Sequence, residues 1–432
     1  MNQSVVWLVG WWHVMALLAA DGAGRMCAAQ PGEAAGEQTL TLEDALRLAK
    51  AHNPELRASG ALVAAAAGRA YQARQWPNPE LEYRAEDWPV GNGRGFGEAK
   101  QTLGIAQTLP YPGKKSLDRR IGRAGLRGSE ADLALRQTEI VRDVKAAFFR
   151  VLASARVLEV TTQLVAVAEA SASAARKRVA AGAAPDQEQL RAEVHWEQAR
   201  AELLGIEREV AAARQVLAGL LGRPDQQEAR LAGTLAELPD AALMETDAEV
   251  RLAQHPSLAA ARARLGRAQL EQERARLEPY PDVKVGVAGG RNGEADQSII
   301  ELGFSVPLPV LDRAKGRRQE ARANVSAAEA EAQSAQQQLR QEWANALKRY
   351  RTAAEQAARH RERILPKADE ALRLVRIGFE EGKFNFIDLV DTQRTAAEAR
   401  LAYQQRLLEM NLAQADLEAL LRPEGGLPSG HQ

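Results

Sequence analysis

Two aspartates near the C-terminal end of the chain, Asp388 and Asp391, are the residues whose spacing most suggests chemistry. Three residues apart in a helical segment, they place both carboxylates on one helix face. Such a pair can attract cations. Judged on these residues alone, a solvated helix face is the ordinary interpretation.

No other set of residues predicts catalysis or metal binding. The six histidines are scattered, and His195 has Glu193 and Glu197 beside it but no further ligand at metal spacing. No phosphate loop or nucleophile–base–acid set stands out. With 57 basic and 57 acidic residues, the chain carries no net charge that would favour nucleic acid. We therefore predict a protein that is not an enzyme, with no cofactor, no metal site and no nucleic-acid partner.

The N-terminal residues are typical of an export signal. An apolar run covers residues 5–20 and small residues follow it, so we expect a signal peptide within 1–29 with its cleavage site open. The single cysteine, Cys27, excludes an intrachain disulfide and leaves lipidation as one alternative. An uncleaved anchor is the other.

The sequence contains a tandem duplication with an offset close to 200 residues. We predict a first repeat over 30–225, a linker over 226–246, a second repeat over 247–424 and a flexible tail over 425–432. Five matched stretches occur in the same order in both copies. Their landmarks pair Pro54 with Pro256, Pro79 with Pro281, Pro110 with Pro309 and Gly182 with Gly382.

Each repeat combines long helices with two short strands. A first helix (41–75, 247–277) is followed by a β-hairpin (79–109, 281–309) and then by a long helical hairpin (114–222, 312–422). A helix of roughly 68 residues would be about 100 Å long. The fold class is therefore mainly α with a small β part, and the long hairpins suit a rod or part of a tube. The basic stretches at 114–120 and 313–322 are expected to be solvated helix starts.

The short strands alternate polar and apolar residues at about the length of a strand that crosses a bilayer. Two hairpins packed on a soluble core are the plain alternative. Four strands cannot close a barrel, and open edges are not tolerated in lipid, so the membrane interpretation requires an oligomer. The residues predicted to face lipid are Leu81, Tyr83, Leu103, Ile105, Val283, Val285, Leu302 and Phe304.

This layout resembles the TolC-like outer-membrane factors of Gram-negative efflux systems, over about residues 39–423. The most specific segments are the duplicated pattern, "QTLPYPGKK" after the second strand and "FEEGKFNFIDLVDTQRTAAEARLAY" at the second helical turn. "PGKKSLDRR" is most similar to the CzcC-like and CusC-like cation-efflux branch.

The resemblance implies a homotrimer in the outer membrane, with a twelve-stranded transmembrane β-barrel that continues as an α-helical barrel into the periplasm. It implies a passive conduit that docks a periplasmic adaptor (membrane fusion protein) and an inner-membrane pump, most simply of the RND type. Heavy-metal cations are implied only by the branch, and organic compounds remain open as substrates. A soluble periplasmic coiled-coil adaptor or scaffold is the alternative function.

The resemblance also assigns roles to residues. Asp388 and Asp391 correspond to the aspartates that ring the closed pore entrance. A polar latch of the family falls on Phe379 and Phe384, so that latch cannot form here. The turns expected to contact the adaptor contain Gly182, Pro185, Glu188, Gly382 and Phe384.

Overall fold

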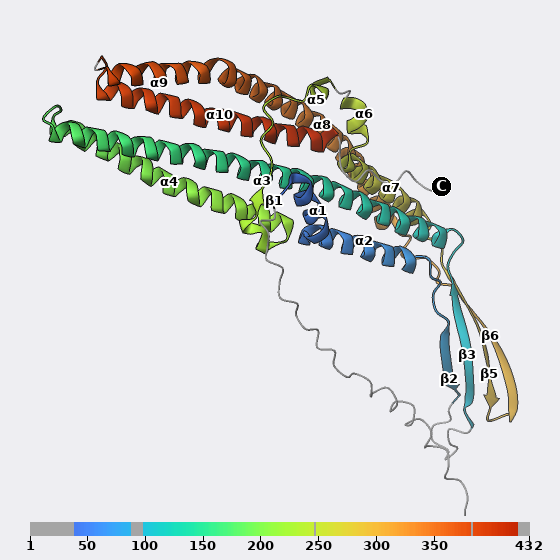
Figure 1. Cartoon of the computed structure of the whole chain (residues 1–432). Helices are drawn as coiled ribbons and strands as arrows, with labels where there is room; N and C mark the ends of the chain where they lie inside the picture. Colours follow the sequence, from blue (N-terminus) through green and yellow to red (C-terminus); the bar gives the residue numbers. More distant parts are fainter. Residues whose placement is uncertain (1–38, 88–97, 246–247, 382, 422–432) are drawn as a thin grey trace, which may run out of the picture. The chain divides into compact units, whose positions relative to one another are not determined.

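The computed structural model describes residues 39–87, 98–245, 248–381 and 383–421, so the predicted signal peptide, Cys27 and the tail lie outside the described residues. Most described residues are helical, and four strands form one antiparallel sheet, which confirms the predicted fold class (Figure 1). The elements are β1 (Thr39–Leu40), α1 (Leu42–His52), α2 (Pro54–Gln72), β2 (Glu80–Glu86), β3 (Lys100–Leu109), α3 (Lys114–Ala180), α4 (Asp186–Leu221), a 3₁₀ helix (Pro224–Glu228), β4 (Arg230–Leu231), α5 (Ala241–Glu245), α6 (Ala248–Ala253), α7 (Pro256–Arg276), β5 (Val283–Asn292), β6 (Gln297–Ser305), α8 (Lys315–Arg359), a π-helical turn (His360–Ile364), α9 (Leu365–Glu380) and α10 (Phe386–Leu421).

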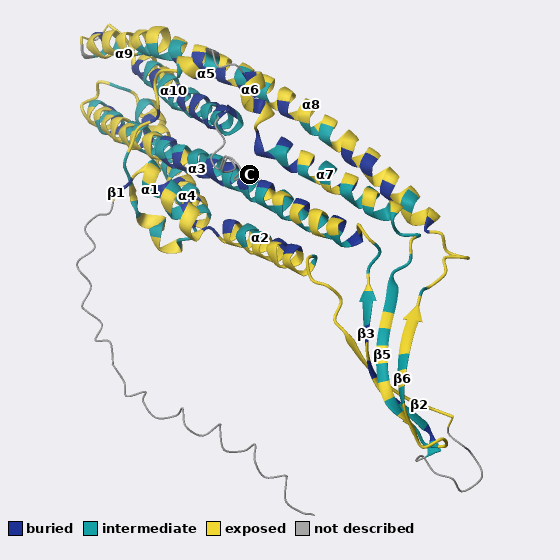
Figure 2. Cartoon of the chain, turned by 90° about the vertical axis from the view of Figure 1, so that its right-hand side faces the viewer, coloured by how far each residue is buried: buried dark blue, intermediate teal, exposed yellow. Residues whose placement is uncertain are grey.

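The long helices lie side by side in four columns. α3 packs against α2, α4, α7 and α10, while α8 packs against α7 and α10 and α9 packs against α10 (Figures 1 and 2). From one side to the other, the first column contains α2 and α4, the second contains α3, the third contains α7 and α10, and the fourth contains α8 and α9. Small residues allow the close approach: a Cβ added at Gly122 of α3 would lie 3.0 Å from the Cα of Ala70 in α2. The 67 residues of α3 span about 100 Å.

The expectation of one unbroken helix at the start of each repeat is wrong. Pro54 and Pro256 each begin a new helix, and the residues before them are extended, with ψ of 125° at Asn53 and 138° at His255. Proline has no N–H to donate, and its ring disfavours the helical conformation at the preceding residue.

Asn53 joins two helices of the first repeat. Its side chain is 2% exposed, and its oxygen accepts hydrogen bonds from the N–H groups of Glu55 (2.9 Å) and Leu56 (3.2 Å). Its amide donates to the carbonyl of Leu220 in α4, at 2.8 Å. One residue therefore caps the start of α2 and joins it to the end of α4, which lies in the same column.

His255 occupies the corresponding position in the second repeat and caps α7. It is 5% exposed, and its Nδ1 accepts from the N–H of Ser257 (3.2 Å) at the start of α7. Burial lowers the pKa of the imidazole, and this shift is partly opposed by the nearby backbone of Ala419 in α10 and by the Glu139 carboxylate. The neutral ring is the form that caps α7.

This joint predicts a pH response. Because the pKa of His255 is lower in the folded chain than the unfolded value of about 6.5, its contribution to stability is present above that pH and is lost as pH falls through the folded pKa. Hydrogen exchange at the first turn of α7 should accelerate between pH 7.5 and 5.5 beyond the intrinsic chemical dependence. His255→Asn, which copies Asn53, should remove that excess. The same excess in both proteins would contradict the prediction.

The second long helix is interrupted as well. The first helix of the hairpin predicted over 312–422 is not continuous, because a π-helical turn, His360–Ile364, separates α8 from α9. Pro366 follows this turn and cannot donate to a carbonyl in the preceding turn, so the helix must widen there.

The stretch between the repeats lies across the second repeat. The N–H of Asp240 donates to the hydroxyl of Tyr350 (2.6 Å), and Asn411 exchanges hydrogen bonds with the backbone of Ala236 (3.0 Å each). Tyr350 and Asn411 are fully or almost fully buried. β1 and β4 add a short parallel pair beside the first repeat.

Candidate membrane face and helix tips

The four long strands form a sheet in the order β2-β3-β5-β6, antiparallel throughout. Its register aligns the alternating apolar residues of all strands on one face. One row runs Leu81, Ile105, Val287 and Leu302. Leu81 is 74% exposed and Leu302 is 85% exposed, so none of the described residues covers this apolar face. All eight residues predicted to face lipid lie on it.

The opposite face is polar at its margins and small at its centre. Lys284 of β5 reaches across β3 to Glu80 (2.7 Å) and Glu82 (2.5 Å) of β2. Lys284 is in register with Thr108 of β3, and it can reach the two glutamates diagonally because their own partners in β3 are the small residues Ala106 and Gly104. Ion pairs therefore connect β5 to β2 across the small side chains of β3. This charged face is suited to water rather than to lipid.

The two edge strands, β2 and β6, have no strand partner on their outer sides among the described residues. Four alternating antiparallel strands make β2 and β6 run in opposite directions. One copy's β6 therefore has the direction needed to pair antiparallel with another copy's β2. A closed arrangement would leave no exposed edge.

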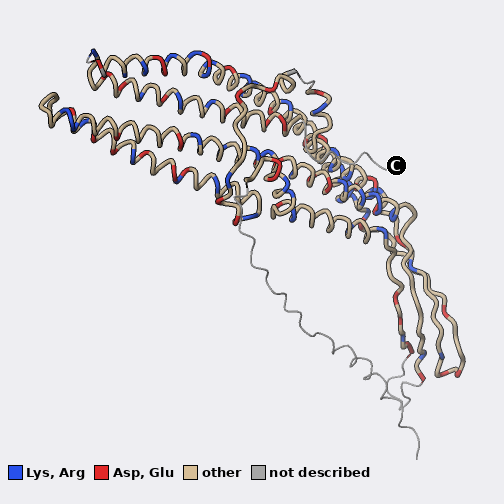
Figure 3. Tube along the Cα trace, viewed as in Figure 1, with Lys and Arg blue, Asp and Glu red and all other residues tan. Residues whose placement is uncertain are grey.

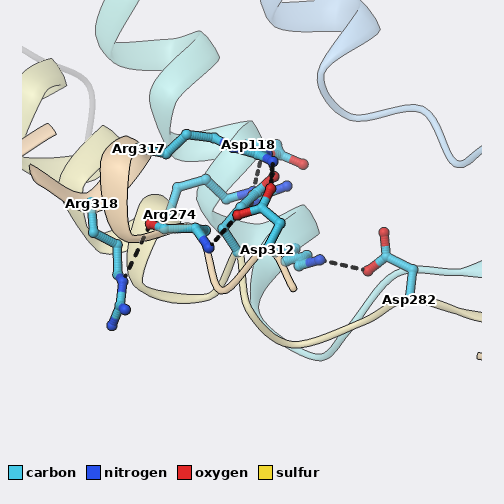
Figure 4. A network of polar contacts seen from close by, with 9 residues as sticks. Asp118, Arg274, Asp282, Asp312, Arg317 and Arg318 are labelled. Carbon is cyan, nitrogen blue, oxygen red and sulfur yellow. Dashed lines mark hydrogen bonds and ion pairs between the residues drawn. The ribbon is translucent and has the colours of Figure 1, made fainter. Parts of the chain in front are cut away.

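The junction of sheet and helices is held by ion pairs between the repeats (Figure 4). Lys114, expected at a solvated helix start, is instead 5% exposed and binds Asp282 at 2.9 Å. Burial would raise the pKa of the Asp282 carboxyl, but hydrogen bonds from Lys114 and from the N–H of Tyr111 lower it overall. The carboxylate therefore stays charged and fixes the start of β5 to the start of α3.

The first helical turn contains the predicted tip residues. Gly182 has φ of +70°, and its N–H and that of Ala183 donate to carbonyls of the last turn of α3. Pro185 is extended and precedes α4, and Glu188 in the first turn of α4 forms an ion pair with Arg178 (3.1 Å). These residues form a closed reversal of the chain.

The second turn gives both aspartates local partners. Asp388 accepts a hydrogen bond from the N–H of Asn385 (3.1 Å), whose side chain accepts from the N–H of Asp388 (2.9 Å), a reciprocal cap at the start of α10. Asp391 pairs with Arg394 at 3.0 Å, and both side chains are about two-thirds exposed. Gly382 lies outside the described residues.

A contact between the tips was not foreseen from sequence. Arg178 of the first turn lies over the ring of Phe379 from the second, 5.5 Å from its centroid. Phe379 and the buried Phe386 pack with Ala172 and Ala175 of α3. The contact between the two tips is therefore apolar and cation–π in character. Phe384 instead covers Gly378, where an added Cβ would meet its ring at 2.3 Å.

Within the described residues there is no group of three or more His, Cys, Asp or Glu side chains that could hold a metal ion. What the chain does offer is an uncovered apolar sheet with open edges and two long helical hairpins. Together these define a subunit of an oligomeric membrane channel with a long helical extension.

The chain belongs to the outer membrane efflux protein family, whose model matches residues 45–223 and 248–421. It is 32% identical over 375 residues to the cobalt-zinc-cadmium resistance protein CzcC of Cupriavidus metallidurans, covering 86% of this chain and 87% of that protein. Among solved structures, the CmeC outer-membrane channel of Campylobacter jejuni superposes with a TM-score of 0.78 at 14% identity, covering 90% of this chain and 87% of CmeC. CusC gives a TM-score of 0.76 at 15% identity, covering 93% and 99%.

The protein is therefore an outer-membrane component of an efflux system that extends into the periplasm. Members of this family are channels, not enzymes, and they are trimeric components of tripartite systems. The predicted family and localisation are confirmed, and the alternative of a soluble periplasmic adaptor is wrong.

Proposed function

We propose that three copies of this chain form a passive conduit from the periplasm to the exterior. The observation that carries the proposal is the four-stranded sheet, apolar on one face and open at both edges. Pairing β6 of each copy with β2 of the next gives twelve strands without a free edge. The eight apolar residues then face lipid, and the ion-paired face lines water.

The proposed partners follow from the helical part. The α3/α4 and α9/α10 turns are the ends farthest along the chain from the sheet, and we assign them to contact with a periplasmic adaptor. The contact set is Gly182, Pro185, Glu188, Gly382 and Phe384. We assign the supply of energy to an inner-membrane pump of the RND type, the partner that membership of this family implies.

We assign heavy-metal cations as the substrate class. The relative CzcC is a cobalt-zinc-cadmium resistance protein. In this chain, Asp388 and Asp391 place two carboxylates per copy at the second tip, where a cation would enter. Carboxylate oxygens suit divalent cations without forming a fixed metal site.

Deletion of the gene tests the substrate assignment. Cells that lack the protein should accumulate more cobalt, zinc or cadmium, measured by mass spectrometry, and wild-type protein should restore export. Sensitivity to organic dyes and detergents should stay unchanged. Unchanged metal content with a rise in dye sensitivity would instead identify an organic-compound channel.

The first tip turn gives a prediction on adaptor docking. Gly182→Val puts a β-branched residue at φ of +70°, which costs about 1–2 kcal/mol or more and should open the reversal. Crosslinking to the adaptor should fall while the trimer still forms. Gly205→Val is the matched control, since Gly205 lies within α4 and a Cβ added there would have no neighbour within 4 Å. Equal crosslinking of both variants would argue against this role of the turn.

A further inference from the structure

The helix segments next to the sheet carry an excess of positive charge on one face. Figure 3 shows Lys and Arg gathered where α3, α7 and α8 approach the strands. The chain as a whole has no net charge, so this excess is local. We call six of these residues the basic collar: Arg119, Arg123 and Arg127 on α3, and Lys315, Arg318 and Arg322 on α8.

Two cavities identify the opposite face of these helices. One, of about 410 Å³, is lined by Asp118, Gly125 and Arg267, and another, of about 260 Å³, by Asp118, Arg274 and Arg317. At 100° per residue, Arg119, Arg123 and Arg127 point about 100–180° away from Asp118. The collar residues of α8 point about 100–160° away from Arg317. Figure 4 shows Arg318 directed away from the ion-pair network.

The two faces differ in how their charges are balanced. On the cavity side, Arg274 pairs with Asp118 (2.9 Å) and Glu278 (2.7 Å), and Arg317 pairs with Glu278 and Asp312. On the collar side, in the part of the chain that the structure describes, no carboxylate lies within ion-pairing distance of the six residues. Arg123, Arg127, Lys315 and Arg322 are exposed. These cations repel one another unless an external anion lies beside them.

Both repeats build this face in the same way. At an offset of 199, Arg119 matches Arg318 and Arg123 matches Arg322. The Arg274 and Glu278 ion pairs hold Asp118 level with Arg317, so the collar covers a band of about 16 Å along the helices. Carboxylates return to this face only beyond the band, at Glu130 and its match Glu329.

The connections between sheet and helices carry large apolar side chains. Trp76 is 60% exposed, Tyr280 is 48% exposed and stacks on Tyr111 (ring centroids 4.7 Å apart), and Leu308 is 77% exposed. From the strands outward the order is apolar face, aromatic and aliphatic band, then cations. That is the order of acyl chains, interface and headgroups in a bilayer leaflet.

We propose that the basic collar binds the phosphates of anionic phospholipid headgroups in the leaflet on the helical side of the sheet. This inference rests on the placement of the sheet in a bilayer under the proposed function. Long Lys and Arg side chains can reach back toward the interface. Each cation near an anionic surface contributes about fivefold in association, within about one Debye length.

The test uses the full-length trimer in vesicles of phosphatidylcholine and phosphatidylglycerol, one of them brominated to quench tryptophan fluorescence. Wild-type protein should prefer phosphatidylglycerol at least fivefold in 50 mM salt, and less in 500 mM. The variant R123Q/R127Q/K315Q/R322Q should have a ratio near one. Millimolar glycerol phosphate should not compete, which separates a lipid surface from a free phosphate.

The matched control is R150Q/R208Q/K348Q/R351Q, which removes four exposed cations far from the sheet that have no ion-pair partner among the described residues. It should keep the wild-type ratio. The proposed lipid site is wrong if both variants lose the preference for phosphatidylglycerol, or if neither does. It is also wrong if the collar variant changes single-channel ion selectivity while its lipid preference stays unchanged. Quenching by phosphatidylcholine without preference overturns the collar alone. Absence of quenching by either lipid overturns the bilayer placement and the proposed function with it.

Discussion

Leu302→Arg should abolish assembly of the channel in the outer membrane. Leu302 is 85% exposed at the middle of β6, in register with Val287 on the apolar face. An arginine facing the bilayer midplane costs about 2–4 kcal/mol per chain, and threefold repetition raises this to about 6–12 kcal/mol per trimer. The amount of trimer in outer-membrane fractions, measured on gels without heating, should fall by more than tenfold.

Gly303→Arg is the control, because it places the same side chain one residue later on the opposite face. Gly303 is exposed, its nearest neighbour would lie 3.9 Å from an added Cβ, and Glu301 is on the same face. This variant should assemble normally. Normal trimer from Leu302→Arg would show that the apolar face is covered by protein, and the membrane placement would then be abandoned.

The contrast between these two positions was accessible from sequence because strand periodicity is strictly two. Any residue in a run such as "SIIELGFS" can be assigned to a face once one neighbour is assigned. The duplication was equally accessible, since prolines and glycines recur at fixed offsets. The order β2-β3-β5-β6, by contrast, joins strands of the two repeats at β3 and β5, and no local pattern specifies that pairing.

Contacts between distant segments account for what sequence did not reveal. Lys114 looked like one of several solvated cations, and only the fold places Asp282 beside it. Arg178 and Phe379 lie about 200 residues apart, so their contact depends on how the two hairpins pack. The break at Asn53, by contrast, is predictable from sequence, because Pro54 disfavours the helical conformation at the residue before it.

The cation preference of the pore should depend on Asp388 and Asp391. With three copies, six carboxylates would surround the axis at the second tip, but the structure adds a counter-charge, since Arg394 lies 3.0 Å from Asp391. An ion pair this exposed is weak, worth about 0.3–0.5 kcal/mol, so it reduces the local field without cancelling it. Planar-bilayer recordings of wild-type trimer should show cation selectivity and block by divalent cations.

Substitution must separate charge from capping, because Asp388 also caps α10 through Asn385. Removing the side chain with alanine would cost about 0.5–2 kcal/mol of local helix stability and confuse the result. Asp388→Asn with Asp391→Asn keeps an acceptor at the cap and removes only the charge. Divalent block should then weaken at least tenfold, about 1.4 kcal/mol, with the trimer intact.

Arg394→Gln provides the opposite change at the same site. It removes the partner of Asp391, so cation selectivity and divalent block should both increase while the cap at Asp388 is untouched. Opposite shifts in the two variants would assign the selectivity to the charge at this turn. If both variants kept wild-type selectivity and block, the aspartates would be a cap and a solvated helix face, and the narrowest charged point of the pore would lie elsewhere.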